Sequence, residues 1–264
     1  MSGAEATERQ RYGTIVIVGG GCYGGYYVRQ LQRAARAGAL SADALVVVDR
    51  DPECAVFRDD AAASGGPIPV ARRVAEWRAF FADYLDQAVA GGASFAADAI
   101  VPSPLMPHLM GEWVVSRARA RFGDRGVDVR PLERSPDVPW ERAGADGTHY
   151  VSFATWTCPV NCIEPRICPH TRDTRTWTLP AAIDEHARRE AAAGRPVVAA
   201  VLHCRHRAYG VGMFDTREVA DADARVAAAG RSAAADVIIG TVSHCHGALT
   251  RLVIGAPLGG SHGR

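Results

Sequence analysis

The sequence TIVIVGGGCYG, residues 14–24, decides the fold. Its first five residues, Thr14–Val18, are all β-branched and run into glycines, a pattern typical of a short buried strand. The residues that follow, from Tyr23 to Ala37, are expected to form a helix. The sequence therefore predicts a strand, a tight turn and a helix in immediate succession.

Three glycines in this stretch fit the spacing G-x-G-x-x-G. At such a turn, Gly19 permits the tight bend, Gly21 lets backbone N–H groups approach a pyrophosphate, and Gly24 allows close contact between helix and strand. The N-terminus of the helix then directs its positive dipole end toward the phosphates. The spacing predicts a dinucleotide site.

A carboxylate follows the second predicted strand, Leu45–Val48. Asp49 lies 25 residues after Gly24, where an acidic side chain can hydrogen-bond a ribose hydroxyl. Because Asp49 would repel a 2′-phosphate, it favours NAD over NADP, although the neighbouring Arg50 weakens that preference. FAD and S-adenosylmethionine also bind over such turns and remain alternatives.

On the glycine spacing and this acidic residue, the segment Thr14–Asp49 resembles the Rossmann-type NAD(P)-binding superfamily. The resemblance covers the N-terminal third of the chain and implies a Rossmann-like fold that binds NAD(P). The expected cofactor-binding residues are those of the turn, the end of the second strand and a later loop: Gly19, Gly20, Gly21, Cys22, Tyr23, Gly24, Asp49, Arg50 and Pro102.

Predicted strands and helices alternate along the rest of the chain, which indicates an α/β fold. We expect a Rossmann-like, mostly parallel sheet with helices on both faces and a cysteine-bearing loop insertion in the second half. Further strands are expected at Ala99–Val101, Val127–Val129, Tyr150–Trp156, Val197–Leu202 and Val237–Val242, and helices at Val70–Val89, Leu109–Arg121, Leu179–Ala193 and Arg217–Ala229.

The segment Ser135–Gly147, rich in Pro, Asp and Gly, is the expected domain boundary. It would separate a dinucleotide-binding domain, residues 1–134, from a second α/β half, residues 135–264, that carries the cysteines and histidines of a metal site. One continuous domain is the alternative.

Three cysteines, Cys158, Cys162 and Cys168, share one loop with the spacing C-x3-C-x5-C, and three prolines stiffen that loop. Three thiols so close in sequence can converge on one centre, as iron–sulfur and zinc sites require. The spacing matches neither ferredoxin pattern, nor the radical S-adenosylmethionine motif. We expect an iron–sulfur cluster, with structural zinc and a metal-free loop as alternatives.

Two more clusters follow predicted strands: HCRH, residues 203–206, and HCH, residues 244–246. Positions after parallel strands share one sheet edge, so these clusters, the glycine turn and the cysteine loop are expected to meet at a single site. Cys245 is slightly preferred over Cys204 as the fourth metal ligand. The histidines expected to act as general acid or base are His203, His206 and His244.

Composition excludes several kinds of chemistry and partner. All 30 basic residues are arginine, which rules out Schiff bases on lysine, attachment of pyridoxal phosphate and the lysine of a P-loop. A net charge of +1 gives no electrostatic basis for a nucleic-acid or membrane partner. Residues 1–13 are polar and no run approaches the length of a membrane span, so we expect a cytoplasmic protein with reduced cysteines.

Together these patterns predict an NAD(P)-binding redox protein with a cysteine-ligated metal centre near the nucleotide. It would act on a small molecule as an oxidoreductase, or use a cluster as a Lewis acid. One alternative is a non-enzymatic nucleotide, redox or metal sensor. The other is a zinc-containing transferase that uses S-adenosylmethionine.

Overall fold

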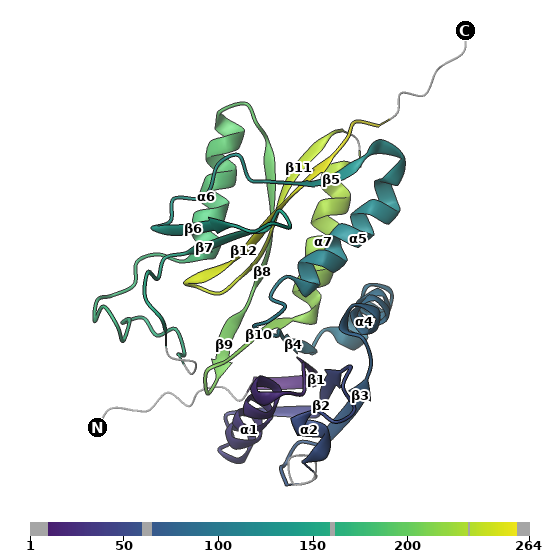
Figure 1. Ribbon diagram of the computed structural model, residues 1–264, viewed down its shortest axis with the longest axis vertical. Coiled ribbons are helices and arrows are strands. Elements are labelled where there is room, and N and C mark those ends of the chain that lie inside the picture. The colour runs from purple at the N-terminus through teal and green to yellow at the C-terminus, as the bar shows by residue number, and fades with distance from the viewer. Residues whose placement is uncertain (1–9, 60–64, 159–161, 232, 258–264) are drawn as a thin grey trace. The chain divides into compact units, whose positions relative to one another are not determined.

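The computed structural model describes residues 10–59, 65–158, 162–231 and 233–257, and it divides the chain into two compact units (Figure 1). The first unit comprises residues 1–106, 160–163 and 205–217, and the second comprises residues 107–159, 164–204 and 218–264. These bounds differ from the predicted division at residue 134.

The first unit contains a six-stranded sheet in the order β3-β2-β1-β4-β10-β9. Its strands are β1 (Gln10–Val18), β2 (Leu40–Asp49), β3 (Val70–Val74), β4 (Ala99–Val101), β9 (Arg205–Ala208) and β10 (Val211–Asp215). The first four strands in this order are parallel to one another. The last two add antiparallel pairings, β10 with β4 and β9 with β10. The carboxyl ends of β1, β2 and β4 therefore lie at one edge.

Helices cover this sheet because its strands are apolar on both faces. The helices are α1 (Cys22–Arg36), α2 (Ala55–Arg58) and α4 (Trp77–Gly91), with a short 3-10 turn η1 (Gly92–Phe95). In α1, Leu31 and Ala34 join a buried cluster with Ile15 and Ile17 of β1. Side chains alternate along a strand, so the equally buried Val16 faces the opposite side of the sheet.

The prediction of one helix over Val70–Val89 is wrong in its first part. Val70–Val74 form β3, parallel to β2, and the helix begins only at Trp77. Two valines four residues apart resemble one face of a helix, and the intervening Arg72 and Arg73 disguise the edge strand. The prediction also missed β9 and β10, which are short and antiparallel.

The second unit contains a sheet in the order β6-β7-β12-β11-β8, and β5 also pairs with β12. Its strands are β5 (Val127–Arg130), β6 (Trp140–Ala143), β7 (His149–Ser152), β8 (Val197–His203), β11 (Ala235–Val242) and β12 (His246–Ile254). Only β8 and β11 pair in parallel, and the other pairs are antiparallel.

The α/β class is confirmed, but the expected mostly parallel sheet is wrong, because the described residues form two sheets and both are mixed. The main cause is β12, which the sequence analysis missed. It follows β11 after residues 243–245, and a connection this short can join only antiparallel strands.

Helices cover both faces of the second sheet (Figure 1). They are α5 (Leu109–Phe122), followed by the 3-10 turn η2 (Gly123–Arg125), α6 (Leu179–Ala192) and α7 (Thr216–Gly230). Ile183 of α6 packs with Ile238 of β11, whereas Gly111 of α5 lies beside the next residue, Ile239. Consecutive residues of β11 therefore face opposite helices.

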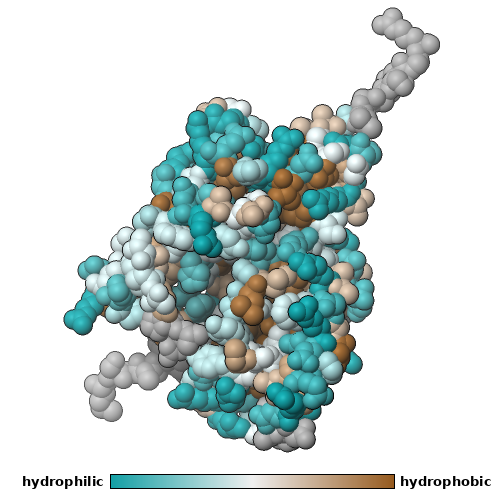
Figure 2. Space-filling view, viewed as in Figure 1, coloured by the Kyte–Doolittle hydropathy of each residue, from teal (hydrophilic) through white to brown (hydrophobic). Residues whose placement is uncertain are grey.

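Hydrophilic side chains dominate the face of the molecule in Figure 2, and hydrophobic ones form small separate patches. Among the described residues, no helix combines the length and the apolar character that crossing a membrane requires.

Candidate functional site

The glycine turn after β1 is shaped by the absence of side chains. Gly19 has a φ of +91°, in the left-handed region that glycine favours. A Cβ on Gly24 would lie 1.9 Å from the carbonyl oxygen of Gly19, and one on Gly20 would lie 2.3 Å from Sγ of Cys54. A Cβ on Gly21 would meet nothing within 4 Å. The turn is closed around Gly24 and Gly20 and open at Gly21.

Asp49 holds this turn from the end of β2. The residue is 8% exposed, and its Oδ2 accepts a hydrogen bond from the backbone N of Gly20 at 2.6 Å. Its Oδ1 accepts one from the backbone N of Asp51 at 2.9 Å. A carboxylate oxygen can accept more than one hydrogen bond, so both oxygens retain acceptor capacity. Asp49 therefore stabilises the turn.

The other predicted cofactor-binding residues surround the same edge. Cys22 and Tyr23 begin α1 and are exposed. Arg50 follows Asp49 and forms an exposed ion pair with Glu76 at 3.7 Å. Pro102 comes directly after β4, which is parallel to β1. The structure thus brings the predicted set to one edge of the first sheet.

Two residues at this edge were missed by the sequence analysis. Cys54 packs its Sγ against Gly20, and burial raises the pKa of its thiol. Trp77 donates from its indole N to the carbonyl oxygen of Val48 at 3.1 Å, and its ring lies beside Gly19. Both come from segments outside the glycine motif, and no pattern in the sequence marks them.

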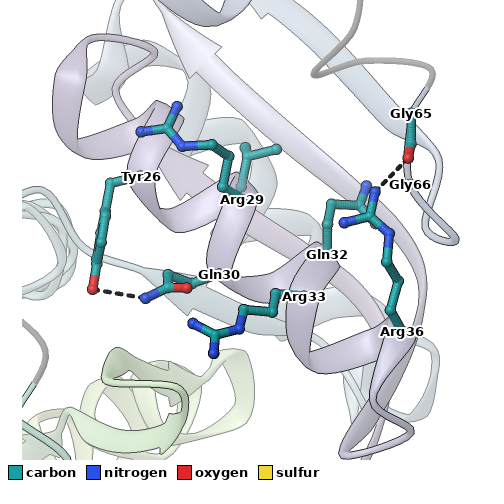
Figure 3. Close-up of a pocket in the computed structure, with 9 residues that line it drawn as sticks. Tyr26, Arg29, Gln30, Gln32, Arg33, Arg36, Gly65 and Gly66 are labelled. Carbon is teal, nitrogen blue, oxygen red and sulfur yellow. Dashed lines mark hydrogen bonds between the residues drawn. The ribbon is translucent and has the colours of Figure 1, made fainter.

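A separate cavity of about 430 Å³ lies along α1, away from these residues (Figure 3). Three arginines of the helix, Arg29, Arg33 and Arg36, line it. Arg36 donates to the carbonyl oxygen of Gly65, and the guanidinium of Arg33 lies 5.1 Å from the ring centroid of Tyr209. The lining contains none of the predicted site residues.

In the second unit, the described part of the cysteine loop forms a small hairpin. The backbone N of Arg175 donates to the carbonyl oxygen of Arg166 at 2.7 Å, and that of Cys168 donates to the carbonyl oxygen of Asp173 at 3.0 Å. Arg172 at the turn has a φ of +63°. The hairpin brings Arg175 back to Glu164, whose carbonyl oxygen accepts a hydrogen bond from its guanidinium.

Glu164 in turn binds His244, which lies between β11 and β12. One carboxylate oxygen accepts a hydrogen bond from the backbone N of His244 at 3.1 Å, and the other lies 2.9 Å from Nδ1 of its ring. The side chain of Glu164 is 4% exposed. The rings of His244 and His203 are 4.7 Å apart and nearly perpendicular. A carboxylate and two imidazoles are therefore adjacent.

Cys245 lies next to this group as a buried thiol. Burial raises its pKa to about 12, the negative charge of Glu164 adds to that effect, and Arg175 opposes it. Nη1 of Arg175 is 3.8 Å from Sγ. The charge of Cys158 raises the pKa of Cys245 slightly further.

The remaining predicted residues are distributed between the units. His203, Cys204 and His244 share one edge, because β8 and β11 are parallel neighbours and His203 pairs with Val242. His206 lies on β9 of the first unit, where its Nδ1 donates to the carbonyl oxygen of Cys162.

Cys168 lies at the hairpin turn, where the backbone N–H groups of Thr171 and His170 lower the pKa of its thiol. Within the described ranges, no three Cys, His, Asp or Glu residues are grouped in a way that could hold a metal ion.

The expectation of a single site at one sheet edge is wrong, because the glycine turn and the histidine–cysteine group belong to different sheets. Glu164 was missed as a site residue. Its carboxylate reaches His244 across 80 residues of sequence, and only its place between two cysteines could have drawn attention to it.

Comparison with known proteins gives one family match, to the C-terminal part of the chain. No curated protein and no solved structure matches the chain. A family model, AF_1314_C, described as "Uncharacterized protein, C-terminal domain", matches residues 110–255, which is more than half of the chain. The match includes the cysteine loop, Glu164 and His244, and it excludes the glycine turn. The chain belongs to the AF_1314_C family.

Proposed function

We propose that the protein is an oxidoreductase that binds NAD(P) over the turn Gly19–Gly24. The observation that best supports this proposal is the contrast among the glycines: space is filled at Gly20 and Gly24 and open at Gly21, where a pyrophosphate would lie. The turn also sits at the carboxyl end of β1, with β2 on one side and β4 on the other. Ligands of open parallel sheets bind where the strand order reverses in this way. On this reading the first unit is Rossmann-like.

The start of α1 suits an anion. Its N-cap is Gly21, with no side-chain hydrogen bond to the cap, and its first turn has no acidic residue. The first backbone N–H groups of a helix lack intrahelical partners and bind phosphate well. In this proposal they hold the pyrophosphate.

Asp49 would bind the ribose. Both of its oxygens accept backbone hydrogen bonds and can accept a further one from a hydroxyl. Its negative charge would repel a 2′-phosphate, and Arg50 beside it is engaged with Glu76. We therefore propose NAD as the preferred cofactor.

The second part of the proposal is a thiolate metal centre at the cysteine loop, with Cys158, Cys162, Cys168 and Cys245 as its proposed ligands. The donor chemistry suits a soft metal, since all four proposed ligands are thiols and the thiolate of Cys168 is favoured by backbone N–H groups. An iron–sulfur cluster would supply single-electron transfer or Lewis acidity, and zinc would supply structure. His244 is the proposed general acid or base, because a buried carboxylate orients it.

Calorimetry with NADH and NADPH tests the nucleotide site. Gly21 has an extended backbone with φ −73° and ψ −153°, and its Cβ would meet nothing within 4 Å, so Gly21→Ala should stay folded and place a methyl group where the phosphates are proposed to lie. We expect the affinity to fall at least about tenfold, or about 1.4 kcal/mol. Gly123→Ala is the matched control, because its Cβ also meets nothing within 4 Å.

The nucleotide part of the proposal fails if the wild-type protein binds neither nucleotide or if Gly21→Ala binds both with unchanged affinity.

The metal centre is tested by the colour and the iron, acid-labile sulfide and zinc content of anaerobically purified protein. Metal-free wild-type protein would remove that part.

A further inference from the structure

Both oxygens of the Glu164 carboxylate contact His244. One oxygen accepts from the backbone N of His244 at 3.1 Å, and the other is 2.9 Å from Nδ1 of the same residue. The Glu164 side chain is 4% exposed and that of His244 is 29% exposed. The carboxylate of the pair is therefore buried, whereas the imidazole is partly exposed to solvent. This arrangement fixes the ring while leaving part of it accessible.

The chain adopts an unfavourable backbone conformation to place this carboxylate. Glu164 has a φ of +50°, in the left-handed region that residues with a side chain seldom adopt. Pro165 follows it, and a residue before proline prefers an extended conformation. The guanidinium of Arg175 holds the carbonyl oxygen of Glu164 in place. Such strain persists where surrounding contacts over-determine it, and it concentrates at functional sites.

The position of the His244 ring is determined from further directions. The backbone carbonyl oxygen of His244 accepts a hydrogen bond from the backbone N of Leu179 at 2.8 Å, which connects the β11–β12 turn to the start of α6. The ring of His203 packs against it at 78°. With Glu164 at Nδ1 and His203 against the ring, rotation of the imidazole is restricted.

We propose that Glu164 is a positioning residue that selects the tautomer of His244. An ionised carboxylate only accepts hydrogen bonds, so Nδ1 carries the proton and Nε2 keeps the lone pair. Nε2 is then the nitrogen that takes a proton from a hydroxyl or thiol of a substrate, and later returns it. This inference deepens the proposed function, in which His244 is the general acid or base.

The same chain contains a matched pair with the opposite geometry. Glu141 of β6 binds Nε2 of His149 on β7, with 2.8 Å between its Oε2 and the ring nitrogen. The side chain of Glu141 is 49% exposed. By the same reasoning His149 should carry its proton on Nε2. The two pairs predict opposite tautomers in one sample.

Long-range ¹H–¹⁵N correlation spectra of protein labelled with ¹⁵N-histidine measure these tautomers directly. Spectra of metal-free protein at alkaline pH should show His244 protonated on Nδ1 and His149 protonated on Nε2. Glu164→Gly removes the carboxylate, and glycine suits the left-handed backbone, so the variant should fold. We expect His244 to shift to the Nε2-protonated form, which free imidazole side chains prefer.

Glu141→Ala is the matched control and should change the resonances of His149 alone. If Glu164→Gly does not fold, Glu164→Asn tests the same point, because asparagine also tolerates a left-handed conformation and its shorter side chain does not reach Nδ1. The proposal is overturned if His244 is protonated on Nε2 in the wild-type protein, or if it stays protonated on Nδ1 in a folded Glu164 variant. The measurement uses neither cofactor nor substrate, so its failure is distinct from failure to bind NAD(P).

Discussion

The glycine turn of the first unit and the cysteine loop of the second are shaped by opposite means. In the turn, Gly24 and Gly20 allow the backbone and Cys54 to come close because they have no side chain. In the loop, the side chains of Glu164 and Arg175 contact the β11–β12 connection, at His244 and Cys245 respectively. The conformation of the turn therefore depends on the absence of side chains at its glycines, whereas the conformation of the loop depends on charged side chains. The two regions should respond to different perturbations.

Thiol reactivity gives the largest expected difference. Burial raises the pKa of Cys245 to about 12 from an ordinary value of 9.0, which lowers its thiolate fraction about a thousandfold. In the cysteine loop, by contrast, backbone N–H groups lower the pKa of Cys168. In native, chelator-treated protein, we expect iodoacetamide to modify Cys168 more than a thousand times faster than Cys245, as followed by mass spectrometry.

Cys54 extends this test to the glycine turn. Burial also raises the pKa of its thiol, so it should react slowly like Cys245. In urea all three cysteines should react at similar rates, which controls for differences among the peptides. If Cys245 and Cys168 were modified at equal rates in the native protein, burial and charge would not control thiol reactivity in this region.

A methyl group added at Gly24 should produce the next largest effect. Its Cβ would lie 1.9 Å from the carbonyl oxygen of Gly19, and both groups are backbone, so neither can move aside cheaply. We expect Gly24→Ala to lower the free energy of unfolding of the first unit by about 3 kcal/mol, the upper part of the range for overpacking. Hydrogen exchange of β1 and α1 peptides measures this.

Gly21→Ala is the control within the same turn. Its Cβ meets nothing within 4 Å, so the unfolding free energy should change by less than about 1 kcal/mol, the usual loss at an N-cap. If both variants were equally stable, the turn would not depend on space in the way the geometry indicates.

The same contrast explains how far the sequence could predict the molecule. Strand β1, the turn and α1 were predicted because local patterns determine them: a β-branched run, a glycine spacing and a helix. Helices α5 and α6 were predicted to within one residue at each end. These elements depend on their own residues.

What the prediction missed depends on partners distant in sequence. The strand β12 was not recognised, and with it the antiparallel character of the second sheet. Glu164 was not recognised because its role arises from contact with His244. The adjacency of His203 and His244 was expected from the rule on strand ends and is confirmed, because β8 and β11 are parallel. That rule could not extend to the glycine turn, which lies on another sheet.

The smallest of the three expected differences between the two units is the loss of stability on acidification. Among the described residues the first unit carries one histidine, His206, whereas the second carries seven. Burial lowers the pKa of His108 and of His186 below the ordinary value of 6.5. Both are therefore neutral in the folded second unit at pH values where the unfolded chain already binds a proton.

The sign follows from proton linkage. Below pH 6.5 the unfolded state binds more protons than the folded state, so the stability of the second unit falls as the pH decreases from 6.5 toward the folded pKa values. Each group contributes at most about 1.4 kcal/mol per pH unit across that window.

Hydrogen exchange at pH 7 and pH 5 should show faster opening in β11 and α6 than in β1 and α1, after correction for intrinsic rates. His186→Leu should reduce this pH dependence, since the side chain is 4% exposed and leucine does not titrate. The double variant with His108→Gln should reduce it further. Equal acid sensitivity of the two units, or an unchanged pH dependence in the double variant, would show that these buried histidines do not distinguish them.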